Sequence, residues 1–392
     1  MLMIQRKLES VCRADLGAFP IVTLTGPRQS GKSTLLRCML PDWQYVNLED
    51  PSQHDFAVQD PKGFLRTYPD RVVFDEIQRA PKLLSYIQVE VDRDRRPGRF
   101  ALTGSHNLLL LETVSQSLAG RTSVRHLLPF SYAELASGLC ALPTIEDQLF
   151  YGAYPLAING LDAASAWLDS YIQTYIERDV RLIRNVGDLG QFRRFVRICA
   201  GRAGQILDLS SIGNDVGLTH NTVRDWVGVL EAGFIAFRLE PFYRNFSKRL
   251  IKSPKLFFYD TGVLCRLLGI NSPPDLHFSP FRGAIFENWC VVECLKSFYN
   301  RGRQPGLYFW KDKAAEVDIV MEISAGKIAA FECKSSVTPP AFALKGPGYL
   351  VKVMREMEVS GSAIYAGTEK QLRNEGPVIP WAEFALYVAN FL

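Results

Sequence analysis

Eight consecutive residues near the N-terminus carry the clearest chemical signature in the chain. Residues 26–33 read Gly-Pro-Arg-Gln-Ser-Gly-Lys-Ser and match the pattern G-x-x-x-x-G-K-[ST]. Glycines at both ends let a backbone wrap around a phosphate without Cβ clashes. Lys32 would neutralise the outer phosphate oxygens, and Ser33 would offer its hydroxyl to Mg²⁺. The pattern therefore predicts a binding site for ATP and Mg²⁺.

The flanking residues supply the context that such a site needs. Residues 21–25 predict a buried strand, and residues 34–40 predict a helix. The helix would direct its N-terminal amides and the positive end of its dipole at the β-phosphate. The alternative interpretation is an ordinary glycine-containing turn, which these flanks disfavour. We expect nucleotide contacts from Gly26, Pro27, Arg28, Gln29, Ser30, Gly31, Lys32, Ser33 and Thr34.

An acidic pair at the end of a second apolar segment would complete this site. Residues 71–74 precede Asp75 and Glu76 and predict a central strand of a parallel sheet. Asp75 would hold Mg²⁺ through water, and Glu76 would polarise the water that attacks the γ-phosphate. Because both acids follow an apolar strand, we interpret them as site residues rather than as solvated surface charge.

Two further polar positions are candidates for the same site. Residues 100–102 predict a third strand, after which Thr103 or Ser105 could touch the γ-phosphate. An ordinary polar turn between strand and helix is the open alternative for these two residues. Arg121 could complete the ATP site of a neighbouring copy, which would require a homo-oligomer. The open alternative for Arg121 is a surface residue at the end of a helix.

Together with motifs further along the chain, these residues resemble a known protein family. The chain is similar to the prokaryotic AAA+-like ATPases that carry a conserved, uncharacterised C-terminal domain. The resemblance covers nearly the whole chain and implies a fold and an ATPase activity rather than a pathway. The matching segments are residues 26–33, 74–78 (Phe-Asp-Glu-Ile-Gln), 102–105 (Leu-Thr-Gly-Ser), 118–121 (Leu-Ala-Gly-Arg), 129–134 (Pro-Phe-Ser-Tyr-Ala-Glu), 152–155 (Gly-Ala-Tyr-Pro), 259–262 (Tyr-Asp-Thr-Gly) and 286–288 (Phe-Glu-Asn).

The middle of the chain has the pattern of a winged helix. Residues 209–216 have a capping serine and the apolar spacing of a short helix. Thr219 could cap a second helix that ends before Gly233, as in a helix-turn-helix. Two segments, 234–239 and 255–259, predict the strands of a wing.

This part of the chain also carries most of the basic surplus. Residues 171–260 contain 14 basic and 9 acidic side chains, whereas the whole chain has a net charge of +4. Such a surface could bind the phosphates of DNA or RNA. The open alternative is a module that only mediates packing, and Asp225 would repel phosphate. The predicted nucleic-acid contacts are His220, Asn221, Arg224, Arg244, Lys248, Arg249 and Lys252.

A second group of chemically active residues lies near the C-terminus. Residues 328–331 predict an apolar strand that leads into Glu332 and Lys334. Residues 317–321 predict a neighbouring strand, which begins near Asp318, and a plausible hairpin turn joins the two. A Glu-x-Lys pattern alone carries little information, but its position at the end of an apolar strand makes it a candidate site.

A helix would supply the remaining member of this group. Residues 283–299 have apolar positions at helical spacing and include Glu287. Restriction-endonuclease-like nucleases have the same order of residues: a glutamate on a helix, an aspartate on a strand, and Glu-x-Lys on the next strand. Asp318 and Glu332 could ligate Mg²⁺, Glu287 could complete the shell, and Lys334 could activate water. The open alternative is an inert binding platform that cuts nothing.

Composition limits the class of protein. The chain has 392 residues of which 47% are hydrophobic, enough for two or three domains with cores of their own. No apolar run approaches the roughly 20 residues of a membrane helix, and the N-terminal apolar stretch is too short for a signal peptide. The eight cysteines form no C-x-x-C pair, so we expect reduced thiols in a cytoplasmic protein.

The sequence therefore predicts an α/β protein with a P-loop AAA+-like ATPase domain, a central winged-helix module and a C-terminal restriction-endonuclease-like domain. We expect Mg²⁺-dependent ATP hydrolysis coupled to DNA binding or remodelling, with metal-dependent nuclease activity left open. The alternative is an ATP-dependent signalling or scaffold protein whose C-terminal domain binds a protein partner. We assign residues 1–140 to the ATPase domain, 141–190 to a helical linker region, 191–262 to the winged helix and 263–392 to the nuclease-like domain.

Overall fold

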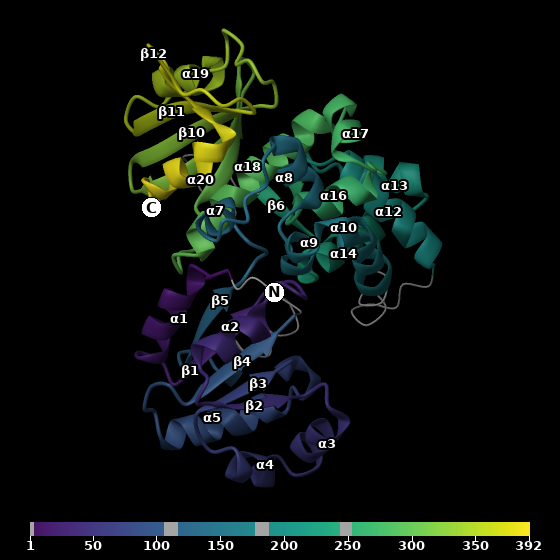
Figure 1. Ribbon diagram of the computed structural model, residues 1–392, viewed down its shortest axis with the longest axis vertical. Helices are drawn as coiled ribbons and strands as arrows, with labels where there is room; N and C mark the ends of the chain where they lie inside the picture. Colours follow the sequence, from purple (N-terminus) through teal and green to yellow (C-terminus); the bar gives the residue numbers. More distant parts are fainter. Residues whose placement is uncertain (1–3, 106–116, 177–187, 244–252) are drawn as a thin grey trace.

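The computed structural model of the chain describes residues 4–105, 117–176, 188–243 and 253–392. Figure 1 shows one sheet formed by the N-terminal residues, a second sheet that contains the C-terminal residues, and a group of helices beside them. The described N-terminal elements are α1 (Leu8–Leu16), β1 (Ile21–Thr25), α2 (Lys32–Met39), β2 (Gln44–Asn47), α3 (Pro51–Gln59), α4 (Pro61–Thr67), β3 (Val72–Asp75), the 3₁₀ helix η1 (Ile77–Arg79), α5 (Leu83–Arg93), β4 (Phe100–Gly104) and β5 (Thr122–His126).

The N-terminal sheet is parallel, with its strands in the order β2-β3-β4-β1-β5. The strands predicted at 21–25, 71–74 and 100–102 are confirmed as β1, β3 and β4. Strand β4 lies between β1 and β3, so that Thr25 pairs with Gly104 and Phe74 pairs with Leu102. Because all strands run in one direction, the residues that follow β1, β3 and β4 lie at the same edge of the sheet.

Both faces of this sheet are buried, because successive side chains along each strand pack against helices on opposite faces. Leu24, Val73 and Ala101 pack against α1 and α2 on one face. Phe74 and Phe100 point to the other face, where they join the buried side chains of α4 and α5. Near-continuous apolar strands between two helical layers are typical of a parallel sheet, which confirms the predicted α/β class for this part of the chain.

The middle of the chain is mostly helical. Its described elements are α7 (Tyr132–Ser137), α8 (Ile145–Tyr151), α9 (Pro155–Asn159), α10 (Leu161–Tyr171), the π-helical turn η2 (Ile172–Ile176), α12 (Leu189–Gly201), α13 (Leu209–Val216), α14 (His220–Ala232), β6 (Ala236–Pro241), β7 (Lys255–Phe258), α16 (Thr261–Leu267) and α17 (Pro273–Phe278). The helices predicted at 209–216 and 219–232 are confirmed, with Thr219 as the cap of α14.

Two local details of this region differ from the expectation. The residue that caps α13 is Asp208, whose side chain accepts a hydrogen bond from the Ser211 amide, and not a serine. An aspartate at this position satisfies a free amide as well as serine does. The predicted wing strands form the antiparallel pair β6–β7, but β6 also pairs in parallel with β8. The hairpin is therefore part of the C-terminal sheet.

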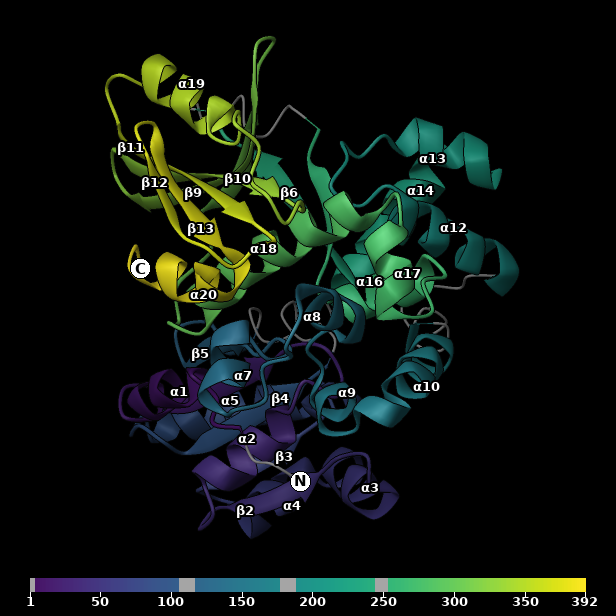
Figure 2. The same ribbon diagram turned by 45° about the horizontal axis from the view of Figure 1, so that its top comes forward.

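The described C-terminal elements are α18 (Arg282–Tyr299), β8 (Leu307–Lys311), β9 (Glu316–Ser324), β10 (Lys327–Lys334), α19 (Lys345–Val353), β11 (Glu358–Tyr365), β12 (Gln371–Arg373), β13 (Gly376–Pro380) and α20 (Trp381–Ala389). The sheet has the order β12-β13-β11-β10-β9-β8-β6-β7. The strands predicted at 317–321 and 328–331 lie within β9 and β10, and the predicted helix at 283–299 is α18. Figure 2 shows α19 on one face of this sheet and α18 and α20 on the other.

Buried side chains connect the middle helices to the C-terminal sheet. One cluster extends from Leu128 through α12, α14 and α18 to Val388 on α20. The divisions predicted at 190 and 262 fall inside this shared core, and the four-part division of the chain stays a prediction. In the part of the chain that the structure describes, no helix is long and apolar enough to cross a membrane.

Candidate functional site

The loop between β1 and α2 has the shape that the sequence pattern requires. Gly26 and Gly31 adopt φ values of 146° and 96°, which favour glycine. A Cβ atom on Gly26 would lie 2.2 Å from the carbonyl oxygen of Leu127, so this position has no room for a side chain. Lys32 is buried, and its ammonium donates to the carbonyl oxygens of Gly26 at 2.9 Å and Pro27 at 2.8 Å. The ammonium therefore lies against the loop, and the donor set fits a phosphate group.

The start of α2 and the end of β3 meet at Asp75. The Ser33 hydroxyl donates to Oδ2 of Asp75 at 2.8 Å, and the Tyr45 hydroxyl donates to the same oxygen. Oδ1 of Asp75 accepts a hydrogen bond from the hydroxyl of Thr103 at the end of β4. Asp75 is thus surrounded by hydroxyl groups from three elements, and the pair Ser33–Asp75 presents hard oxygen ligands that suit Mg²⁺.

Glu76 is the next residue and has a strained backbone. Its φ of 56° lies in the left-handed region, which few residues other than glycine adopt. Its carboxylate accepts hydrogen bonds from Ser105 at 3.1 Å and from Gln78, while its amide donates to Thr103 at 3.3 Å. Strain of this kind is typical of functional sites. Thr103 at the end of β4 and Ser105 directly after it therefore both contact the acidic pair.

Burial lowers the pKa of Lys32 to about 8, and the charges of Glu76 and Asp75 oppose that shift. Taking the ammonium out of water disfavours its charge, so a nearby anion is needed to stabilise it. A triphosphate in the loop would supply that anion. The electrostatics of the loop thus favour the binding of a negatively charged ligand.

A mainly apolar cavity of about 210 Å³ lies beside the loop. It borders the loop and α2 at Gly31, Thr34 and Leu35. Its other walls come from the N-terminal segment and from the region around α9: Ile4, Gln5, Arg6, Glu9, Cys38, Phe130, Pro155 and Asn159. The cavity is therefore continuous with the residues predicted to contact the nucleotide.

Arg121 lies at the opposite edge of the sheet. Its carbonyl accepts a hydrogen bond from the amide of Ile21, the first residue of β1, whereas the phosphate loop follows the last residue. Its guanidinium makes two hydrogen bonds to Asp92 on α5, at 2.9 Å and 2.8 Å. Arg121 is thus separated from the loop of its own chain by the length of a strand. Its predicted role in a neighbouring copy stays a prediction.

The residues predicted to contact nucleic acid are described only in part. His220, Asn221 and Arg224 are exposed on α14. Asp225, which we expected to oppose phosphate binding, is half-buried. The other predicted contacts lie outside the described residues: Arg244, Lys248, Arg249 and Lys252.

The acidic residues near the C-terminus lie near one another, at α18, β9 and β10. Lys334 donates to Oε1 of Glu332 at 2.6 Å, and the amide of Cys333 donates to Oδ2 of Asp318 at 2.7 Å. Burial, followed by the charge of Asp318, raises the pKa of Glu332 and of Glu287 above the ordinary value, and the charge of Lys255 opposes the shift at Glu287. Among the described residues, no three His, Cys, Asp or Glu side chains are placed so that they could hold a metal ion. The predicted metal site at these acids therefore stays a prediction.

A lysine that the sequence assigned to the wing lies inside this acidic cluster. The Lys255 ammonium contacts Oε1 of Glu287 at 3.1 Å and Oε1 of Glu316 at 2.7 Å. Lys255 is buried, and although burial opposes its charge, the surrounding carboxylates raise its pKa above the ordinary value. An internal ammonium is thus paired with Glu287, one of the three carboxylates predicted to hold a metal ion.

Sequence reasoning missed three residues of these sites. Tyr45 is the second residue of the short strand β2, Arg6 lies before the first helix, and Lys255 was assigned to a strand of the wing. None of the three belongs to a pattern with fixed spacing, and only the pairing of distant elements brings them to the sites. Tyr45 pairs with Val73, two residues before Asp75 on β3, and no sequence pattern marks that pairing in advance.

Comparison with known proteins identifies the family. The chain is 32% identical over 344 residues to the uncharacterized protein Rv2008c of Mycobacterium tuberculosis, covering 86% of this chain and 76% of that protein. The uncharacterized protein Mb2031c of Mycobacterium bovis matches to the same extent. The chain belongs to the family of these two proteins. Within it, residues 18–136 match the AAA domain, residues 142–274 a domain of unknown function (DUF8612) and residues 282–384 another domain of unknown function (DUF4143).

The AAA domain of this family member coincides with the parallel sheet and its loop. The N-terminal part is thus a P-loop AAA-type ATPase domain that binds ATP, and the C-terminal part is the DUF4143 domain. Among solved structures, the Walker-type ATPase PABY2304 of Pyrococcus abyssi is 16% identical with a TM-score of 0.46, covering 68% of this chain and 96% of its own. AMPPCP-bound DnaA from Aquifex aeolicus is 12% identical with a TM-score of 0.32, covering 57% and 85%.

Proposed function

We propose that the protein is a Mg²⁺-dependent AAA-type ATPase whose cycle of ATP binding and hydrolysis controls its binding to DNA. The observation that carries the first half of this proposal is the hydrogen bond between Ser33 and Asp75, beside Lys32 and Glu76. It brings a phosphate-binding loop, a hydroxyl ligand and an acidic pair to one edge of a sheet. These are the groups that phosphoryl transfer to water requires.

Each of these residues has a role in the proposed reaction. Mg²⁺ bound at Ser33 and Asp75 would neutralise charge on the β- and γ-phosphates. Lys32 holds the same phosphates from the loop side. Glu76 accepts a proton from the attacking water, and Ser105, which donates to Glu76, fixes the orientation of that carboxylate. Thr103 holds Asp75 in place.

The cavity beside the loop is the proposed site of the adenine base. It borders Gly31 and Thr34, so a nucleotide with its phosphates in the loop would place its base there. Apolar walls and a few polar groups are typical of sites that bind flat aromatic ligands. Leu35, Phe130 and Pro155 would supply the apolar contacts.

DNA binding is proposed from the arrangement of α13 and α14. The two helices pack together, and Gly217, with a φ of 79°, forms the turn between them. We interpret them with the β6–β7 hairpin as a winged helix, in which α14 would present His220, Asn221 and Arg224 to a groove. The basic residues of segment 244–252 would add phosphate contacts.

An ATPase assay with duplex, single-stranded and branched DNA tests this proposal. We expect DNA to stimulate turnover several-fold, with stimulation falling steeply as salt rises, because phosphate contacts release counterions. Arg224→Ala should weaken DNA binding and lower the salt slope by about 1. Arg93→Ala, which changes an exposed arginine on α5, is the matched control and should leave DNA binding unchanged. Equal turnover with and without every form of DNA would contradict the proposal.

A second candidate function follows from Lys255. Because this lysine neutralises Glu287 and Glu316, we propose that the DUF4143 domain, which we interpret as restriction-endonuclease-like, acts as a binding platform for a protein partner and does not cleave DNA. In a cleavage assay with Mg²⁺ or Mn²⁺, the wild type should then give no product. Cleavage that disappears in Glu332→Ala would contradict the platform and support the nuclease.

We further propose that the protein works in the cytoplasm as a homo-oligomer in which Arg121 reaches the ATP of a neighbouring copy. To do so, Arg121 would leave its partner Asp92. Arg121→Ala and Lys32→Ala should each be inactive alone but regain turnover when mixed, since each supplies what the other lacks. Full turnover by Arg121→Ala alone would contradict this role.

A further inference from the structure

Arg6 holds the phosphate loop from outside the loop itself. It precedes α1 and is 7% exposed. Its guanidinium donates to the carbonyl oxygen of Ser30 at 2.8 Å and to that of Leu128 at 2.6 Å. Ser30 belongs to the loop, and the residue before Leu128 packs against Gly26 at the start of the loop. The planar guanidinium of Arg6 therefore holds the loop in a fixed position relative to the segment that follows β5.

Glu134 receives the third bond of this guanidinium. Nε of Arg6 donates to Oε1 of Glu134 at 3.1 Å, and the amide of Lys7 donates to the same oxygen at 2.8 Å. The other carboxylate oxygen accepts hydrogen bonds from the amide and the hydroxyl of Ser131, the cap of α7. Although burial opposes its charge, Arg6 and these amides hold the pKa of Glu134 below the ordinary value. The carboxylate is thus a fixed junction between the loop and α7.

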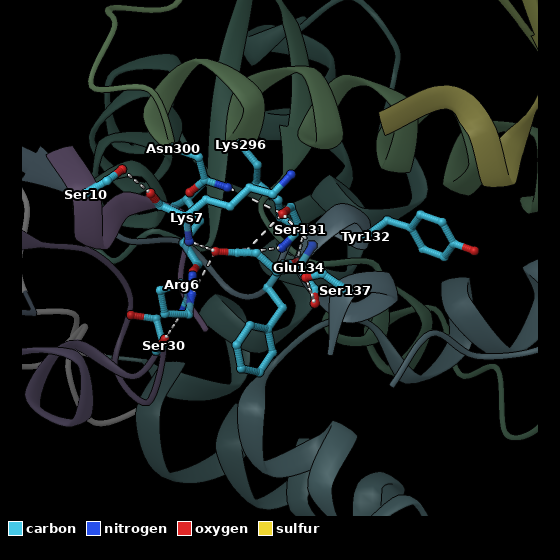
Figure 3. A network of polar contacts seen from close by, with 12 residues as sticks. Arg6, Lys7, Ser10, Ser30, Ser131, Tyr132, Glu134, Ser137, Lys296 and Asn300 are labelled. Atoms are coloured by element: carbon cyan, nitrogen blue, oxygen red, sulfur yellow. Dashed lines mark hydrogen bonds and ion pairs between the residues drawn. The ribbon is translucent and has the colours of Figure 1, made fainter. Parts of the chain in front are cut away.

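The segment that begins α7 is in turn bound by α18. Lys296 donates to the carbonyl oxygen of Phe130 at 2.7 Å and to Glu293 at 2.9 Å. The amide of Tyr132 donates to Glu293 at 2.8 Å, and Asn300 donates to the hydroxyl of Ser131 at 3.4 Å. Figure 3 shows this network, with Ser30 and Arg6 on one side and Lys296 and Asn300 on the other.

We propose that Arg6 is a positioning residue for the phosphate loop, and that through Glu134 it couples nucleotide binding to the position of α18. The inference rests on ATP binding at the loop, but not on DNA binding or nuclease activity. Ser30 and Lys296 are connected by buried hydrogen bonds through Arg6, Glu134 and the peptide segment 130–131. A loop that changes shape around a triphosphate would move the Ser30 carbonyl, and the rigid fork of Arg6 would pass that displacement to Glu134 and α7.

The far end of α18 makes this coupling functionally relevant. The same helix carries Glu287, which pairs with Lys255 in the acidic cluster of the C-terminal domain. A shift of α18 would therefore alter this acidic cluster when ATP binds. Coupling of this kind is a free energy shared by two sites and must be reciprocal, so changes in α18 should alter nucleotide affinity.

A double-mutant cycle on the full-length protein tests the proposal, with the dissociation constant of a fluorescent ATP analogue as readout. Arg6→Met should raise that constant by about tenfold, because the loop loses its outer support. Arg6→Lys keeps a positive charge near Glu134 and should raise the dissociation constant less than Arg6→Met does. Arg99→Met is the matched control, since Arg99 is equally buried in the same sheet domain and donates to three carbonyl oxygens away from the loop. It should stay within about twofold of the wild type.

The second arm of the cycle changes α18. The paired variant Glu293→Gln with Lys296→Met removes both charges at once and touches no nucleotide contact. It should raise the dissociation constant by about threefold in the wild type and leave it unchanged in the Arg6→Met background. If Arg6→Met does not fold, the same cycle is measured with Arg6→Lys in its place. An unchanged constant in the α18 variant, or the same factor in both backgrounds, would overturn the coupling. Absence of binding by the wild type would instead contradict the ATP site itself.

Discussion

The hydroxyl of Ser33 donates a 2.8 Å hydrogen bond to Oδ2 of Asp75, although 42 residues separate the two in the sequence. This contact joins the first turn of α2 to the end of β3. It exists because β4 lies between β1 and β3 and all of these strands run in parallel. The same arrangement places Thr103 and Ser105 beside the acidic pair.

Glu76→Gln should separate ATP binding from hydrolysis. The substitution keeps the size of the side chain and its contacts with Ser105 and Gln78 but removes the acceptor for a proton. We expect turnover to fall by at least about 100-fold, with nucleotide affinity within a few-fold of the wild type. Single-turnover assays alongside equilibrium binding measure both quantities. Retained turnover would show that another group takes the proton.

Lys255→Met should destabilise the C-terminal sheet. It leaves Glu287 and Glu316 without their shared buried cation, and we expect a loss of about 3 kcal/mol or more in the free energy of unfolding. Chemical denaturation of wild type and variant measures this loss.

Lys311→Met is the matched control for that substitution. Lys311 also contacts Glu316, at 2.6 Å, but its side chain is 53% exposed. Screening by water limits the expected loss to less than about 1 kcal/mol. Equal losses in the two variants would mean that Lys255 does not act as an internal cation.

His126 should make stability depend on pH. Burial, followed by the charge of Arg125, lowers its pKa to about 4 from an ordinary value of 6.5. Between these values the unfolded chain binds a proton that the folded chain does not, so stability falls as the pH falls from 6.5 to 4. Its ring packs against Tyr299 with centroids 4.8 Å apart, and His126→Phe should preserve that packing.

The slope of unfolding free energy against pH is the measurement for His126. Over this range, His126→Phe should reduce the slope by up to about 1.4 kcal/mol per pH unit relative to the wild type. The carboxylates titrate equally in both proteins, so the difference isolates the histidine. Parallel curves for the two proteins would contradict the prediction.

The sequence was most informative where chemistry requires fixed spacing. The loop at 26–33 and the acids at the end of β3 could be placed in advance, because an apolar strand leads into each, whereas Thr103 and Ser105 were candidates with an ordinary turn as the alternative. The helices at 209–216 and 283–299 were also predictable from their apolar periodicity. What these elements contact could not be predicted in the same way.

Contacts between distant elements account for what the sequence did not predict. Arg6 reaches Glu134 across 128 residues, and Lys255 reaches Glu287 from a strand assigned to another module. Pairing of β6 with β8 makes one sheet from two predicted modules. Long-range pairing and the burial of isolated charges leave no periodic signal, so only the fold reveals them.

The most direct test of the account is ATP turnover by Lys32→Ala, purified and assayed in parallel with the wild type and with Arg99→Met. The account predicts that the Lys32 variant loses at least about 100-fold in turnover, because the loop loses the ammonium of Lys32, while the Arg99 variant keeps the wild-type rate. Turnover by Lys32→Ala equal to that of the wild type would contradict the assignment of the ATP site.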